Sequence, residues 1–303
     1  MVRLQFSIQL AYEVAPSGCD FIFNLQAAQT AQQQVVTEQL AISQPVLAHA
    51  HTDPATHTRF LRLKAQAGPL VVRYGATLDI QHHVAAPAQI GEVPVADLPA
   101  AVLPYLYPSR YCQSDRLHRF AVHTFGHLQQ GYGRARAIRD WVQQHVQFCS
   151  NASDGSTSAV DTLVEKVGVC RDFAHLMIAL CRAVNIPARF TTGIDYGADP
   201  ALGPTDFHAY VEAFLGDRWY VFDPSGAAIP MGFVRFATGR DAADAAFATI
   251  FGGVVASAPV IAIQSVPNAQ GQRIEPVHVS HALSTDGQEI IRKNGIQPAS
   301  VLA

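Results

Sequence analysis

The feature that most constrains this chain is a run of apolar residues at helical spacing, followed by the pattern of a β-hairpin. Both lie between Gly168 and Gly226. Apolar side chains recur at positions 173, 177, 180, 181 and 184, which is the spacing of one helix face. Asn185-Ile186-Pro187 predicts the end of this helix. The pattern places Cys170 in the first turn, where free N–H groups and the helix dipole favour a thiolate over a thiol. We expect the Cys170 amide to be one donor to an oxyanion.

The hairpin is predicted by two runs with a period of two residues, 206–215 and 218–225, joined by Gly216-Asp217. Glycine followed by aspartate between such runs is typical of a two-residue turn. In the register that this turn sets, His208 and Asp223 become diagonal neighbours on one face. Diagonal neighbours lie about 7–8 Å apart at the backbone, within reach of a hydrogen bond from a ring to a carboxylate. The opposite face is apolar and suits packing against the preceding helix.

Cys170, His208 and Asp223 therefore form a candidate nucleophile, base and orienting group. Each has a simpler structural interpretation when taken alone: a small buried cysteine, a strand histidine with a satisfied ring, and an aspartate in a turn. These simpler interpretations do not require the two hairpin residues to share a face or the cysteine to begin a helix. The combination favours catalysis.

At these positions the chain resembles the transglutaminase-like superfamily, and in particular bacterial cysteine proteases of that superfamily that carry a β-rich N-terminal domain. The resemblance is strong over about 103–252 and weak before it. Two positions depart from the usual family pattern, Tyr210 where tryptophan is common and Ser225 where threonine is common. The matching segments are Gly168–Leu176, Asn185–Phe190 with Gly193, His208–Glu212, Trp219–Ser225, Leu103–Cys112 and Thr238–Asp244.

The resemblance implies a papain-like core with a Cys-His-Asp triad and no cofactor. The reaction it implies is acyl transfer through a thioester on Cys170, most simply the hydrolysis of a peptide or amide bond. Transfer to a second amine, as in a protein-glutamine transglutaminase, shares the first half-reaction and stays open. A non-catalytic peptide-binding module on the same fold is the alternative from another class.

The order of patterns predicts an α+β chain, with an antiparallel β-sandwich at 1–100 and C-terminal strands at 261–303 that close the fold. Between them, the resemblance implies a transglutaminase-like core at 101–260. We expect strands at 3–12, 21–26, 34–42, 58–67, 69–82, 188–196, 259–266 and 273–279, and helices at 115–129, 134–147, 159–165 and from 241 toward 250. A link rich in proline and alanine is expected from 85 to 108.

Composition limits the possible partners. A net charge of −3 with scattered Lys and Arg predicts no nucleic-acid partner. No apolar run approaches the roughly 18 residues that span a bilayer, and the first residues alternate like a strand. We therefore expect a cytoplasmic protein with no membrane partner. The acyl-transfer chemistry of the candidate triad implies a peptide or protein substrate.

Cysteine and histidine usage predicts neither a disulfide framework nor a metal site. The five cysteines are an odd number without a Cys-x-x-Cys pair, and Cys181 is expected in the core. Among thirteen histidines, His123 and His127 have i, i+4 spacing. No carboxylate lies between them, unlike in a zinc-protease helix, so we expect them on a solvated face. His175 is expected to pack within the helix. Arg110, Tyr111 and Asp241 are expected near the cleft by resemblance, or as structural hydrogen-bonding groups.

Overall fold

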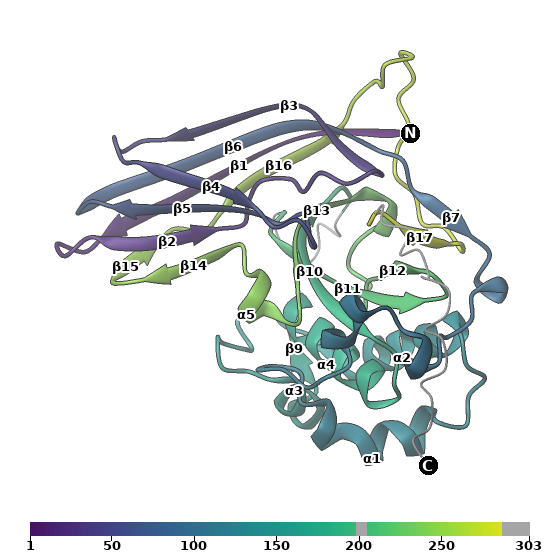
Figure 1. Cartoon of the computed structure of the whole chain (residues 1–303). Coiled ribbons are helices and arrows are strands. Elements are labelled where there is room, and N and C mark those ends of the chain that lie inside the picture. Colours follow the sequence, from purple (N-terminus) through teal and green to yellow (C-terminus); the bar gives the residue numbers. More distant parts are fainter. Residues whose placement is uncertain (198–204, 287–303) are drawn as a thin grey trace, which may run out of the picture.

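The computed structural model of the chain describes residues 1–197 and 205–286. It has a β-sandwich built mainly from the N-terminal hundred residues and a mixed helix-and-sheet half below it (Figure 1). The predicted fold class is confirmed. Within the described residues, no helix is long and apolar enough to cross a membrane.

The sandwich consists of two antiparallel sheets. The first has the order β15-β1-β6-β3, with β16 also paired to β1, and the second has the order β14-β2-β5-β4. Alternate residues of β1 are buried, as the period of two predicts, and they meet the apolar face of the second sheet in one core. The strands are β1 (Val2–Val14), β2 (Cys19–Phe23), β3 (Gln33–Ile42), β4 (Ala48–Thr52), β5 (Arg59–Ala65), β6 (Gly68–Ile80), β14 (Ala248–Phe251), β15 (Val254–Ala256) and β16 (Val260–Ser265).

The other half places helices against one antiparallel sheet with the strand order β12-β11-β10-β13. Its strands are β10 (Ala188–Asp195), β11 (His208–Leu215), β12 (Arg218–Phe222) and β13 (Phe233–Gly239), and its helices are α1 (Ser114–Phe125), α2 (Tyr132–His145), α3 (Ala159–Glu165), α4 (Cys170–Ala183) and α5 (Ala242–Ala245). Two short pairs complete it: β8 (Gln147–Phe148) with β9 (Val167–Gly168), and β7 (His83–Ala85) with β17 (Ala282–Ser284).

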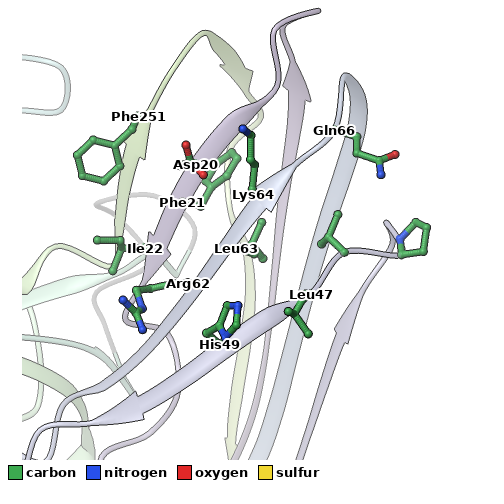
Figure 2. Close-up of a pocket in the computed structure, with 12 residues that line it drawn as sticks. Asp20, Phe21, Ile22, Leu47, His49, Arg62, Leu63, Lys64, Gln66 and Phe251 are labelled. Carbon is green, nitrogen blue, oxygen red and sulfur yellow. The ribbon is translucent and has the colours of Figure 1, made fainter.

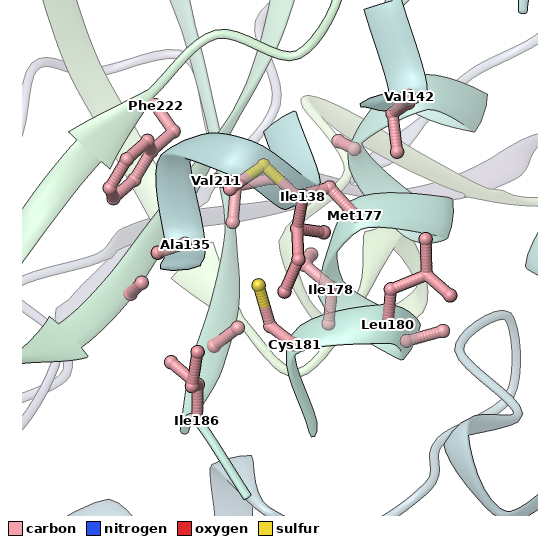
Figure 3. Close-up of a cluster of buried hydrophobic side chains, with 14 of the residues drawn as sticks. Ala135, Ile138, Val142, Met177, Ile178, Leu180, Cys181, Ile186, Val211 and Phe222 are labelled. Carbon is pink, nitrogen blue, oxygen red and sulfur yellow. The ribbon is translucent and has the colours of Figure 1, made fainter. Parts of the chain in front are cut away.

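Helix α4 is the centre of this half. Met177, Ile178 and Cys181 point into a cluster that also takes side chains from α2 and from the sheet, among them Val211 and Phe222 (Figure 3). A helix that is buried on nearly every side is held by packing rather than by its own hydrogen bonds. The predicted core position of Cys181 is confirmed, since its side chain is fully buried.

The hairpin forms in the predicted register. Leu215 pairs with Arg218 and Val211 pairs with Phe222. Gly216 adopts a φ of 62°, a left-handed conformation that glycine reaches without steric cost, so the turn can stay at two residues.

Several details differ from the sequence-based expectation. The helix predicted from 241 toward 250 is limited to α5, because 248–251 pair with β2 as strand β14. No strand forms at 273–279, where Pro276 lacks a ladder donor, whereas β4, β7 and β17 were not predicted. The expected link contains regular structure. It forms three short 3-10 helices and packs against Phe214 and Trp219. These helices are η1 (Pro87–Gln89), η2 (Val95–Asp97) and η3 (Ala100–Tyr105). The end of the predicted C-terminal segment, 287–303, lies outside the described residues.

The two halves are joined by buried polar contacts. The amide of Gln33 donates to the carbonyl oxygens of Ala28 at 2.7 Å and Arg235 at 2.9 Å, while its own oxygen accepts from Arg235 N at 2.9 Å. Asn24 donates to Ala246 O at 2.8 Å, near the start of β14. Because all these groups are buried or partly buried, separating the halves would leave them without partners.

Candidate active site

Cys170 begins α4 and is half-buried at the mouth of a cleft. The helix begins here because Asp172 folds back and accepts a hydrogen bond from Val169 N at 2.9 Å, an N-terminal cap of the capping-box type. The residue before Val169 must be small, since a Cβ on Gly168 would lie 2.7 Å from the Cβ of Asp172. The Cys170 Sγ lies 4.0 Å from Phe207 O, so the thiol sits beside the first residues of the hairpin.

His208 and Asp223 meet as the hairpin register predicts. The Nε2 of His208 lies 3.3 Å from Asp223 Oδ1, and the ring is also within hydrogen-bonding reach of the Cys170 thiol. The structure therefore brings all three predicted residues together, although Cys170 comes from a helix, His208 from a strand and Asp223 from the loop after β12. Their catalytic roles remain a prediction.

The electrostatics of this cluster favour an imidazolium. Burial by itself would lower the pKa of His208, but the charge of Asp223 and its hydrogen bond, together with Cys170, raise that pKa well above the ordinary value. Burial would likewise raise the pKa of Asp223, yet the charge of His208 and the hydrogen bonds it accepts keep the pKa below its usual range. At neutral pH His208 is thus charged and paired with an ionised Asp223.

Asp223 is fixed by its own loop. Its Oδ1 accepts from the Ser225 amide at 3.0 Å and the Ser225 hydroxyl at 2.7 Å, and its Oδ2 accepts from Ala228 N at 3.0 Å. Ser225 therefore performs the capping that a threonine hydroxyl could also perform, so the departure at this position keeps the contact. The carboxylate has little freedom to turn away from His208.

A second carboxylate, which sequence reasoning missed, lies on the other side of the ring. Asp195 Oδ1 is 3.9 Å from His208 Nδ1, and the Asp195 side chain is 1% exposed. Burial, with the charge of Asp223 acting in the same direction and that of His208 opposing, raises its pKa to about 6. The pairing of Gly193 with His208 in β10 and β11 places Asp195 diagonal to His208, but the sequence did not reveal that these two strands pair.

The cleft around Cys170 has a volume of about 470 Å³ and a mixed lining. Phe207 and Phe247 stack with centroids 3.9 Å apart and form an aromatic wall. Charge comes from Arg171, Asp195 and Asp206. The lining residues are Phe148, Ser150, Asn151, Val169, Cys170, Arg171, Phe190, Thr192, Asp195, Asp206, Phe207, His208, Ala209, Ala227, Ala242, Ala246 and Phe247.

The loop that contains Ser153 and Asp154 is held beside the nucleophile by Asp172, whose side chain is fully buried. Asp172 accepts a hydrogen bond from the Ser153 hydroxyl, and Arg171 donates to the Ser153 oxygen and to Asp154 O, both at 2.9 Å. One acid thus starts the helix that carries Cys170 and anchors the preceding loop.

The sandwich carries a larger hollow of about 740 Å³, shown in Figure 2. Residues of β2 and β5 line it, among them Asp20, Arg62 and Lys64, together with His49 from β4. None of the candidate site residues lines it, and its charged groups are mixed in sign. We assign it no chemistry.

The far part of the hairpin's polar face is structural. Glu212 accepts from Arg189 Nε at 2.7 Å and is also bonded to Arg235, and Asp286 accepts from Arg189 at 2.6 Å and from Arg235 at 3.2 Å. Of the hairpin's polar face, only the end near His208 therefore lies at the candidate site. Glu212 and Arg235 are fully buried, so the network holds three strands and the segment after β17 together.

The remaining candidates have structural environments. His175 is buried, stacks on Tyr111 at 4.9 Å between ring centroids, and accepts from Ala242 N at 3.2 Å, as expected of a packed residue. Asp241 accepts from Tyr111 N at 3.0 Å and from Ala243 N at 2.9 Å. His123 and His127 are exposed. Across 1–197 and 205–286, no three His, Cys, Asp or Glu residues group as a metal site would require.

Comparisons with known proteins match both halves. The model of the transglutaminase-like superfamily matches residues 119–224, which include all three candidate residues. The model of the bacterial transglutaminase N-terminal domain matches residues 2–101.

One solved structure is similar over nearly the whole chain. It is a protein from Cytophaga hutchinsonii described as a "putative cysteine protease", with 38% identity and a TM-score of 0.86, covering 93% of this chain and 97% of that one. A protein of Mycobacterium leprae described as uncharacterized is 30% identical over 115 residues, which are 36% of this chain and 41% of that protein. The chain thus covers less than half of the Mycobacterium protein.

Proposed function

This chain belongs to the transglutaminase-like superfamily, and we propose that it is a cysteine-dependent acyl-transfer enzyme that hydrolyses peptide or amide bonds. Cys170 is the nucleophile, His208 the proton carrier and Asp223 its orienting group. The observation that carries the proposal is the position of His208, bonded to Asp223 at 3.3 Å and within reach of Cys170 at the N-terminus of α4.

The first half-reaction follows from the charges. The Cys170 thiolate attacks the substrate carbonyl carbon, and the negative oxygen that forms is stabilised by first-turn N–H groups, including the Cys170 amide. His208, which starts as an imidazolium, donates its proton to the leaving amine as the C–N bond breaks. The product is a thioester on Cys170 and a free amine.

In the second half-reaction His208 acts as a base. It removes a proton from water, which attacks the thioester carbonyl, and the C–S bond breaks to release a carboxylic acid and regenerate the thiolate–imidazolium pair. Asp223 stays ionised throughout, because its carboxylate accepts hydrogen bonds from Ser225 and Ala228 in addition to His208. Its task is to keep Nδ1 of the ring directed to the sulfur.

The lining of the cleft supports a peptide substrate with a large apolar side chain near the reacting carbonyl. Phe207 and Phe247 stack beside Cys170, and Phe148 and Phe190 line the same space. Burial of an aromatic or branched aliphatic side chain against such a wall contributes roughly 1.5–3 kcal/mol. The description of the Cytophaga protein as a "putative cysteine protease" is consistent with this choice.

Transfer of the acyl group to a primary amine is the second candidate function, favoured by the match of residues 2–101 to a transglutaminase N-terminal domain. Both reactions pass through the same thioester. A peptide-binding module without catalysis is the third. It would not need a reactive thiol at Cys170, so Cys170 would be no more reactive than an ordinary cysteine.

The test is mass spectrometry of a peptide library incubated with the protein, with and without a primary amine, using Cys170→Ala as the matched control. Hydrolysis yields cleaved peptides, or glutamine side chains deamidated to glutamate, whether or not amine is present. Transamidation yields glutamine side chains linked to the amine. If the library is unchanged relative to Cys170→Ala in both arms, the enzymatic proposal is wrong.

A further inference from the structure

Asp195 is a buried acid that the reaction described above does not use. It ends β10, lines the cleft together with Cys170, and places Oδ1 3.9 Å from Nδ1 of His208. Nδ1 is the ring nitrogen on the side away from Asp223, because Nε2 is bonded to Asp223. His208 therefore lies between two carboxylates, one facing each ring nitrogen.

The two carboxylates differ in how they are satisfied. Asp223 accepts hydrogen bonds from its own loop on both oxygens. Asp195 Oδ2 is buried and has no hydrogen-bond partner among the described residues. A buried carboxylate without donors is costly unless a charge compensates it, and the compensating charge next to Asp195 is the ring of His208.

Tyr210 provides a second buried polar group beside the His208 ring. Its ring packs edge-on against His208, with centroids 4.6 Å apart, and its hydroxyl is buried without a partner in the part of the chain that the structure describes. Burial first, and then the charges of Asp195, Asp223 and Cys170, raise the pKa of Tyr210 well above its ordinary value. The hydroxyl thus stays protonated, and Asp195 is among the charges that act on it.

We propose that Asp195 is a positioning residue which, supported by the Tyr210 hydroxyl, stabilises the His208 imidazolium from its Nδ1 side. The proposal rests on the proposed function, since the imidazolium is the acid that protonates the leaving amine. The ionisable groups facing His208 are Cys170 from α4, Asp195 from β10, Tyr210 from β11 and Asp223 from the loop after β12. Arg171 and Asp206 also line the cleft.

The proposal predicts a two-step titration. Because burial raises the pKa of Asp195 to about 6, its negative charge is present above that pH and lost below it. The charged acid favours the protonated ring, so it holds the pKa of His208 higher than Asp223 alone would. Removing the charge should lower the titration midpoint of His208 by about one pH unit, the lower end of the range for an opposite charge at this separation.

NMR of the intact protein carrying ¹³C-labelled histidine measures that midpoint directly, with the His208 resonance identified by its absence in His208→Gln. Asp195→Asn should shift the midpoint down by about one pH unit. Tyr210→Phe should shift it by less, and should add nothing in the Asp195→Asn background, because it acts through Asp195. Asp217→Asn is the matched control: it removes a carboxylate at the far end of the same hairpin, 60% exposed, and should leave the midpoint unchanged.

An unmoved midpoint in folded Asp195→Asn overturns the proposal, as does an equal shift in Asp217→Asn. If Asp195→Asn does not fold, the titration of the wild-type protein tests the proposal instead. Its His208 resonance should show a second inflection near pH 6 that coincides with the titration of the Asp195 side-chain carboxyl carbon, and its absence overturns the proposal. These readouts do not need turnover, so an inactive protein with the expected titrations would refute the proposed function and leave the role of Asp195 standing.

Discussion

The sharpest test of the candidate site is the difference in alkylation rate among the five cysteines. Burial raises the pKa of Cys181 to about 12, with smaller effects from Glu92, Arg134 and Arg182, and Cys112 is likewise fully buried. At pH 7.5 a thiol of pKa 12 is ionised about 3,000-fold less than a free cysteine of pKa 8.5. Cys181 and Cys112 should therefore react with iodoacetamide only after denaturation.

Cys149 supplies the internal reference, because it is exposed whereas Cys170 is half-buried in the cleft. A free thiol is only about 0.3% ionised at pH 6. A thiolate held beside an imidazolium gains up to about 300-fold over that, and its lower intrinsic nucleophilicity removes part of the gain. We expect Cys170 to react at least about ten-fold faster than Cys149 at pH 6.

The assay is iodoacetamide labelling at pH 5 to 9, followed by peptide mapping of each cysteine. His208→Ala should move the Cys170 profile to higher pH, because it removes the ion-pair partner and leaves the helix terminus in place. The Cys149 profile should not change in that variant. If Cys170 reacts no faster than Cys149 at pH 6, or if its profile is unmoved in His208→Ala, the thiolate–imidazolium pair does not exist in the resting protein.

Three further predictions concern single substitutions. Cys170→Ala should abolish turnover while thermal unfolding stays cooperative, since it removes one half-buried sulfur; a lost transition would mark Cys170 as structural. Asp223→Asn should lower kcat/KM by roughly 10²–10⁴-fold, less than the loss in His208→Ala, and wild-type activity would exclude Asp223 from the mechanism. Arg235→Met should lower the free energy of unfolding in urea by about 3–5 kcal/mol, because it leaves Glu212 without one of its two buried arginine partners; a change under about 1 kcal/mol would contradict this.

The parts of the structure that the sequence predicted are those in which the signal is local. The period of the segment after Gly168 defined α4, and Gly216-Asp217 defined the hairpin register, so His208 and Asp223 could be placed side by side without a structure. In each case the residues that determine the geometry lie within about twenty positions of one another. That Cys170 lies beside His208 and Asp223 was implied by the family resemblance.

The parts that were missed depend on pairing between distant segments. The alanine-rich run after Asp241 has a high helix propensity, yet 248–251 form a strand because β2 offers an edge. Asp195 is unremarkable until β10 pairs with β11. In the sequence, Arg189 and Arg235 look like ordinary surface residues. Only the structure shows that both faces of their sheet are buried, and that the two guanidinium groups are paired with Glu212 and with the carboxylate of residue 286.

The position of His208 depends on the sandwich as well as on its own sheet. β13 pairs with β10, and the backbone of Arg235 in β13 is held on both its N–H and C=O groups by the side chain of Gln33 from the sandwich. Ile194, next to Asp195, packs in the sandwich core rather than in that of the helices. A displacement of the sandwich would therefore move the strand that carries Asp195, and with it the charge beside the His208 ring. The N-terminal half is thus a structural support of the candidate active site, whatever surface it also offers to a partner.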